Sequence, residues 1–161
     1  MVDLNYPLDF ILCYRFEFYK VVDGGCCSDC AFFGRCPECP KDVIGECRGP
    51  LRSDGRDIIF EQVKRPESAV FRAARVEYAN YCCEYCKKPI SGMNEQWHHT
   101  LDADGKRRDK YECFETTRGV CYACHEKGSV LQFFRKEVDI WLLKQYSEDE
   151  VRKITGRGLH I

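Results

Sequence analysis

The chain contains 161 residues, 44% of them hydrophobic, which is sufficient to bury one main core and a small metal-stapled appendage. It has no apolar run long enough to cross a bilayer, and residues 1–10 lack the basic-then-apolar order of a secretory signal, so the sequence predicts a cytoplasmic protein without a membrane partner. The net charge of −1 excludes the strong overall basic excess of many nucleic-acid-binding domains; because residues 61–161 hold eighteen basic and sixteen acidic side chains, any DNA contact is expected there.

The first predicted element is a β-strand. Aromatic and aliphatic side chains occupy every second position of residues 10–19, and this period of two is typical of a strand. A turn at Gly24-Gly25 follows, and a short apolar run at residues 58–60 predicts another strand. Between the turn and that run lies a cysteine-dense stretch, residues 26–47.

This cysteine-dense stretch predicts a structural zinc site. Without a secretory signal, closely spaced cysteines meet a reducing compartment and are expected to bind metal rather than to form disulfides. The predicted ligands are Cys27, Cys30, Cys36 and Cys47. Cys39 is the competing ligand and Cys26 a spare, and an iron–sulfur cluster is the alternative to zinc. The stretch is interpreted as a zinc-stapled module that docks a partner or contacts DNA.

The second half of the chain begins with a predicted helix. Pro66 suits a first helical turn, and apolar residues recur at helical spacing as far as Ala79. A turn-rich segment then predicts two short strands, around Trp97 and Phe114, joined by a loop.

Further helices are predicted toward the C-terminal end. One begins near Cys121 and is interrupted by Gly128, after which Ser129 is expected to cap a second helix. Ser147 and Glu150 have the spacing of a capping box and predict a last short helix.

Two Cys-x-x-Cys pairs in this half predict a second zinc ion. Its expected ligands are Cys83, Cys86, Cys121 and Cys124. Each pair can present two thiolates from one tight knuckle, and four thiolates complete a tetrahedral zinc site. On this spacing alone, a zinc ribbon that only holds strands together is an equal alternative.

Histidines lie between and beside these two pairs. His98 and His99 are adjacent, and His125 directly follows Cys124. A structural zinc ion with four cysteine ligands needs none of them, whereas imidazoles can bind a catalytic cation or act as a general base near neutral pH.

The order Cys-x-x-Cys, His-His, Cys-x-x-Cys-His resembles the zinc-containing HNH nucleases, a branch of the ββα-metal (His-Me finger) superfamily, over residues 82–127. The resemblance implies an endonuclease of the kind that bacteriophages carry, with His99 as general base. It implies that His98 and His125 bind a divalent cation such as Mg²⁺, Mn²⁺, Ni²⁺ or Zn²⁺. The expected fold is α+β, with a cysteine-rich module at residues 1–62 and a zinc-stapled ββα-metal core flanked by helices at residues 63–161.

One position departs from the family pattern, and four basic residues are candidates for contacts to DNA. Thr116 stands where the family usually has an asparagine that braces the loop holding the base; threonine can make only some of those hydrogen bonds. Arg118-Gly119 resembles a pair in endonuclease VII-type resolvases, where Arg118 would contact a phosphate or cover the zinc loop. Three basic loop residues are further candidates for DNA binding: Lys106, Arg107 and Arg108.

Two functional hypotheses follow. The first is a metal-dependent endonuclease that hydrolyses DNA phosphodiester bonds. The second is a catalytically inert zinc protein that uses the same scaffold to bind nucleic acid or a protein partner. The histidines favour the first, and the low net charge and Thr116 favour the second.

Overall fold

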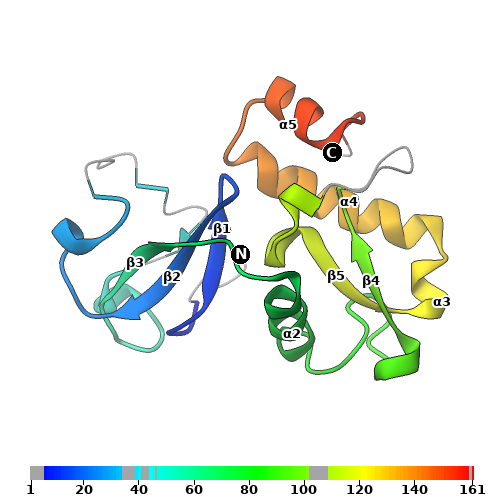
Figure 1. Ribbon diagram of the computed structural model, residues 1–161, viewed down its shortest axis with the longest axis horizontal. Helices are drawn as coiled ribbons and strands as arrows, with labels where there is room; N and C mark the ends of the chain where they lie inside the picture. Colours follow the sequence, from blue (N-terminus) through cyan, green and yellow to red (C-terminus); the bar gives the residue numbers. More distant parts are fainter. Residues whose placement is uncertain (1–5, 34–38, 41–43, 46, 102–108, 160) are drawn as a thin grey trace. The chain divides into compact units, whose positions relative to one another are not determined.

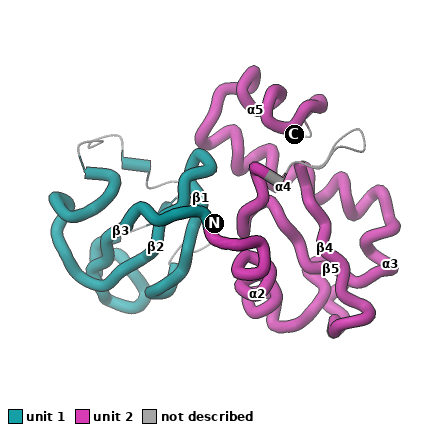
Figure 2. The backbone as a smooth tube through the Cα atoms, viewed as in Figure 1, with its two compact units in different colours: residues 1–65 teal, residues 66–161 magenta. Residues whose placement is uncertain are grey.

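The computed structural model describes residues 6–33, 39–40, 44–45, 47–101, 109–159 and 161. The chain divides into two compact units, residues 1–65 and 66–161 (Figure 2), whereas the sequence suggested a boundary after residue 62. Small antiparallel sheets and helices make up these units, so the predicted α+β class is confirmed. No helix in the described ranges is both long and apolar enough to cross a membrane.

The first unit is built on a three-stranded antiparallel sheet (Figure 1). Its strands are β1 (Ile11–Tyr14), β2 (Glu17–Asp23) and β3 (Ile58–Val63), with β2 in the centre. Short 3₁₀ turns cover Cys27–Asp29 and Gly49–Leu51. The core of the unit is formed by Leu12, Tyr19, Val21, Phe32, Ile44, Ile58 and Phe60.

The single strand predicted for residues 10–19 is wrong, because this segment is a β-hairpin. Tyr14 pairs with Glu17, and the two residues between them, Arg15 and Phe16, have φ angles of 53° and 60°. Positive φ at both central positions defines a type I′ turn, which usually contains Asn or Gly. Neither Arg nor Phe is typical of such a turn. The alternation of residues 10–19 continues through these two positions, so the sequence gives no sign of a turn there.

The second unit contains a two-stranded antiparallel sheet. β4 (Glu95–His99) pairs with β5 (Thr117–Cys121), and these are the two short strands that the sequence predicted. The strand expected around Phe114 begins only at Thr117, because Phe114–Thr116 form a 3₁₀ turn. Further 3₁₀ turns cover Gly92–Asn94 and Asp109–Tyr111.

Helices pack against this sheet (Figure 1). The helix predicted after Pro66 is confirmed as α2 (Ser68–Tyr78), which contacts β5. The short helix α3 (Tyr122–His125) follows β5 directly and contacts both strands. α4 (Gly128–Leu143) packs on α3, and α5 (Glu148–Thr155) packs on α4.

The helix ends test two sequence predictions. Ser129 does not cap α4, because the N-cap is Lys127 and the helix has already begun at Gly128. The capping box of α5 is confirmed. The Ser147 backbone N–H and hydroxyl each donate a hydrogen bond of 2.9 Å to the Glu150 carboxylate. Both signals are local, but a serine that directly follows a glycine can cap a helix only if the glycine itself is not helical.

Candidate metal centre and histidine site

Four cysteines of the second unit converge. The sulfur atoms of Cys83, Cys86, Cys121 and Cys124 all lie within 4.8 Å of one another. A tetrahedron with Zn–S bonds of about 2.3 Å has edges of about 3.8 Å. The Cys86 and Cys121 sulfurs are 3.8 Å apart. This four-cysteine cluster could therefore bind a metal ion such as zinc.

Local backbone geometry brings the two pairs to one point. In the first knuckle, the Cys83 N–H donates to the Lys88 carbonyl at 2.8 Å, and the Lys87 N–H donates back to the Cys83 carbonyl at 2.9 Å. Lys87 has a φ of 62°, which reverses the chain within the knuckle. In the second pair, β5 ends at Cys121 and α3 begins at the next residue, so one helical turn carries Cys124 back to the cluster.

The thiols of the cluster differ in acidity. Burial by itself raises the pKa of Cys83, but backbone N–H groups, led by that of Cys86, donate hydrogen bonds to its sulfur and lower the pKa to about 7. Burial, reinforced by hydrogen bonds with the other three thiols, raises the pKa of Cys124 to about 12. Because metal ligands must be thiolates, binding of a metal ion here would displace protons and would weaken as the pH falls.

The carboxylate of Glu84, whose side chain is only 9% exposed, ties the first knuckle to β5. Arg75 of α2 donates two hydrogen bonds to it, at 2.8 and 2.5 Å, and the Gly119 backbone N–H donates a third at 2.7 Å. The Arg118 Nε lies 3.7 Å from the same carboxylate. Glu84 therefore holds both cysteine pairs in register through one ion-pair network.

Arg118 is buried, with a side chain that is 8% exposed. Its guanidinium donates to the carbonyls of Glu115 and Thr117, at 2.7 and 2.8 Å, and lies 3.3 Å from the Glu137 carboxylate. Burial, together with the nearby charge of Arg75, lowers the pKa of Arg118 to about 10. Of the two sequence interpretations, this arrangement fits the one in which Arg118 covers the zinc loop.

His98 and His125 lie beside the four-cysteine cluster and face each other. Their ring centroids are 5.9 Å apart, with the planes at 75°. His98 Nε2 is buried and has no hydrogen-bond partner within the described part of the chain. Burial, with the positive charge of neighbours such as His125, lowers the pKa of His98 to about 3, so its imidazole is neutral with an available lone pair. His125 is half-buried, with Nδ1 3.5 Å from the Glu126 carboxylate. A buried, unsatisfied nitrogen opposite a second imidazole fits a divalent cation completed by water or phosphate oxygens.

His99 lies on the opposite face of β4, because successive residues of a strand point to opposite sides. Its Nδ1 is 3.8 Å from Oε1 of Glu112. The Glu112 side chain is 3% exposed; its Oε2 accepts a hydrogen bond of 2.5 Å from the Ser68 hydroxyl, and its Oε1 lies 3.6 Å from Arg72. Sequence reasoning missed Glu112, because an acidic residue in a turn-rich loop has no spacing that relates it to His99.

Thr116 links the residue after His99 to the start of β5. Its carbonyl accepts hydrogen bonds from both the backbone N–H and the hydroxyl of Thr100, at 3.0 and 2.8 Å. Its hydroxyl donates to the Tyr111 carbonyl at 2.8 Å and accepts from the Cys113 N–H at 3.0 Å. All these bonds hold the segment that follows His99 and contains Glu112.

The remaining predicted site residues are not brought together. Cys27 is exposed, whereas Cys30 and Cys47 pack against the core of the first unit. Within the described ranges, these three sulfurs do not form a group as close as the four-cysteine cluster. Four predicted residues lie outside the described residues: Cys36, Lys106, Arg107 and Arg108. The zinc ion of the first unit and the basic loop stay predictions.

The second unit thus holds a four-cysteine cluster, a facing pair of imidazoles on one side of β4, and a histidine with a buried carboxylate on the other. These groups offer a metal-binding cluster, a second pair of nitrogen ligands and a candidate base within one small fold. Comparisons with protein-family models, with curated proteins and with solved structures found no match for the chain.

Proposed function

We propose that the protein is a metal-dependent endonuclease of the HNH type that hydrolyses phosphodiester bonds in DNA. The observation that carries this proposal is the buried Nε2 of His98, which has no partner in the described part of the chain and faces His125 at 5.9 Å between ring centroids. The order β4, β5, α3 around a four-cysteine cluster supports the same assignment.

The positions of the histidines suit in-line displacement at phosphorus. The attacking and leaving oxygens lie on opposite sides of the transferred group. His99 and His98 are on opposite faces of β4, so a phosphate at the end of this strand can meet a base on one side and cation ligands on the other. A divalent cation bound by His98 and His125 would stabilise charge on the leaving oxygen.

The proton transfer is assigned to His99. Its Nε2 takes a proton from water while the water oxygen bonds to phosphorus and the bond to the leaving oxygen breaks. Glu112 faces Nδ1, so it favours the tautomer that has its proton on Nδ1 and its lone pair on Nε2. The leaving oxygen is protonated by solvent.

The second candidate function is an inert zinc scaffold that binds nucleic acid or a protein. Its specific support is that Thr116 replaces the amide of the family pattern and that Arg118 is already engaged by the carboxylates of Glu84 and Glu137. The hydrogen bonds of Thr116 nevertheless tie down the segment that directly follows the base, which favours the enzyme.

A plasmid-nicking assay tests the proposal. Supercoiled DNA is incubated with the zinc-loaded protein and Mg²⁺, Mn²⁺, Ni²⁺ or Zn²⁺, and the wild type is compared with His99→Ala. We expect cutting by the wild type and a loss of roughly 10²- to 10⁴-fold in the variant, because a general base contributes about that factor. Lys144→Ala, at an exposed position after α4, is the control and should cut normally. Intact plasmid with every metal, from wild-type protein that retains its zinc, contradicts the enzyme hypothesis and favours the inert scaffold.

Replacing Glu112 by Gln should lower the nicking rate on the order of 10- to 100-fold, because a neutral amide no longer favours the required tautomer of His99. The control is Ser68→Ala, which removes a hydrogen bond to Glu112 but leaves its charge facing His99. The measurement is kcat with saturating plasmid. If Ser68→Ala and Glu112→Gln slow the reaction equally, Glu112 serves the fold and does not position His99.

A further inference from the structure

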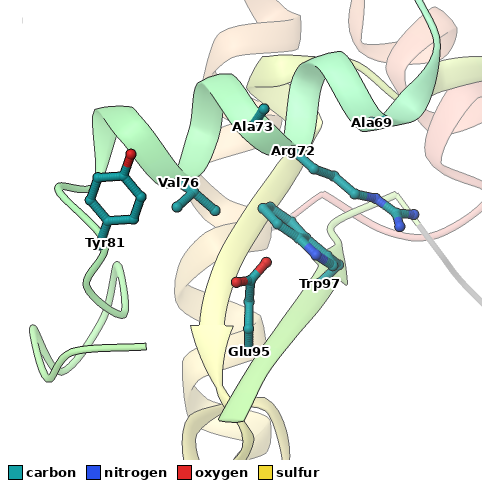
Figure 3. Close-up of a pocket in the computed structure, with 7 residues that line it drawn as sticks. All are labelled: Ala69, Arg72, Ala73, Val76, Tyr81, Glu95 and Trp97. Atoms are coloured by element: carbon teal, nitrogen blue, oxygen red, sulfur yellow. The ribbon is translucent and has the colours of Figure 1, made fainter. Parts of the chain in front are cut away.

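A cavity of about 400 Å³ opens between α2 and β4 in the second unit (Figure 3). Trp97 and Glu95 project from β4 toward α2, and Arg72 and Val76 line it from the helix. Tyr81, just after α2, closes one side. The volume lies within the range of small-molecule pockets, roughly 300–1,000 Å³, and easily admits one nucleobase.

The indole of Trp97 forms a flat aromatic wall. It is opposite Gly119 in the strand register, and a Cβ at Gly119 would lie 3.7 Å from the indole ring, so the ring rests against the glycine. The Arg72 guanidinium lies over the same ring, 5.8 Å from its centroid. Aromatic rings and guanidinium planes are the surfaces on which unpaired bases stack.

Two polar groups at the cavity have unused hydrogen-bonding capacity. The half-buried Glu95 carboxylate makes no hydrogen bond or ion pair with the described residues, and Arg72 Nε is buried without a hydrogen-bond partner among them. A carboxylate accepts hydrogen bonds from amino and imino N–H groups at base edges. Guanine offers two adjacent donors, whereas thymine offers one between two carbonyls that a carboxylate repels.

The cavity is connected to the proposed base. Glu95, Trp97 and His99 are alternate residues of β4 and share one face, and two residues of extended strand span roughly 7 Å. Arg72 also lies 3.6 Å from Glu112, the residue that faces His99. A base held against Trp97 would therefore bring its own phosphate toward His99.

We infer that this cavity binds one unpaired nucleobase of DNA, guanine in preference to thymine, beside the phosphate that is cut. The inference rests on the proposed function in that it names the substrate: DNA with an unstacked base, either single-stranded or displaced from a duplex. Stacking on Trp97 supplies affinity, and the carboxylate of Glu95 selects the base.

Fluorescence can test the binding separately from cutting. The chain has two tryptophans, and Trp141→Phe leaves Trp97 as the only one. With the zinc-loaded protein and no divalent cation added to the solution, a short oligothymidine containing one central guanine should quench this fluorescence, and all-thymine DNA should bind more weakly. In otherwise wild-type protein, followed by anisotropy of labelled DNA, Trp97→Ala should weaken binding of the guanine-containing DNA by about 5- to 150-fold, and Trp97→Phe should retain most of it. Glu95→Gln should abolish the preference for guanine.

Two further arms identify the ligand. A duplex with one unpaired guanine should bind more tightly than the fully paired duplex. Free dGMP should bind much more weakly than DNA; equal affinity would mean a free-nucleotide site and would overturn the inference. Equal binding by wild type and Trp97→Ala, with no quenching, would also overturn it, even if the plasmid is cut. Trp97-dependent binding without nicking in any metal would support the base pocket and contradict the nuclease.

Discussion

Removing the metal from the four-cysteine cluster is expected to unfold the second unit. The cluster is part of its hydrophobic core, since three of the four cysteines are buried among Ile90, Val120, Val130 and Phe134. An isolated two-stranded sheet and a one-turn helix have little stability of their own. Zinc binding supplies roughly 10–16 kcal/mol in small zinc domains, which is comparable to the whole free energy of unfolding of a domain, about 5–15 kcal/mol.

Tryptophan emission measures this effect cleanly, because both tryptophans, Trp97 and Trp141, belong to the second unit. Titration with a strong chelator should shift the emission to that of an exposed indole, and added zinc should restore it. Cys121→Ser should reproduce the loss, whereas the control Cys82→Ser, next to the cluster but outside it, should not. Native emission after elemental analysis has shown full metal removal would contradict the prediction.

The second large effect is expected from Glu84. Changing it to Ala leaves the buried guanidinium groups of Arg75 and Arg118 without their shared carboxylate and removes the acceptor of the Gly119 N–H. Removing one partner of a buried ion pair lowers the free energy of unfolding by about 3–5 kcal/mol, because the remaining charge stays desolvated. The loss is a large fraction of the stability of a domain, so we expect a fall in the free energy of unfolding of about that size.

Urea denaturation with saturating zinc, followed by tryptophan emission, provides the measurement. Glu84→Gln should lower the free energy of unfolding less than Glu84→Ala does, because an amide oxygen can still accept hydrogen bonds from Gly119 and Arg75. The matched control is Glu148→Ala, which breaks an exposed ion pair with Arg152 and should cost at most about 1 kcal/mol. If Glu84→Ala lowers the free energy of unfolding by no more than Glu148→Ala does, the ion-pair network around Glu84 does not stabilise the fold.

Local signals in the sequence predicted local structure. The capping box at Ser147 and the helix after Pro66 depend on residues within a few positions of one another, and both are present. The Arg15-Phe16 turn was missed because its conformation is imposed by pairing of the flanking strands rather than by its own residue types. The cap predicted at Ser129 is wrong because α4 already begins at Gly128, with Lys127 as its N-cap.

The sequence by itself determined the composition of the four-cysteine cluster, because each Cys-x-x-Cys pair is a self-contained knuckle and two pairs satisfy one tetrahedral ion. Only the tertiary structure decided what surrounds it. Glu84 and Glu112 look like surface carboxylates in the sequence, yet Glu84 packs between Arg75 and Arg118, and the buried Glu112 faces His99. Burial and charge pairing are long-range properties of the packed chain, so residue spacing along the sequence carries no record of them.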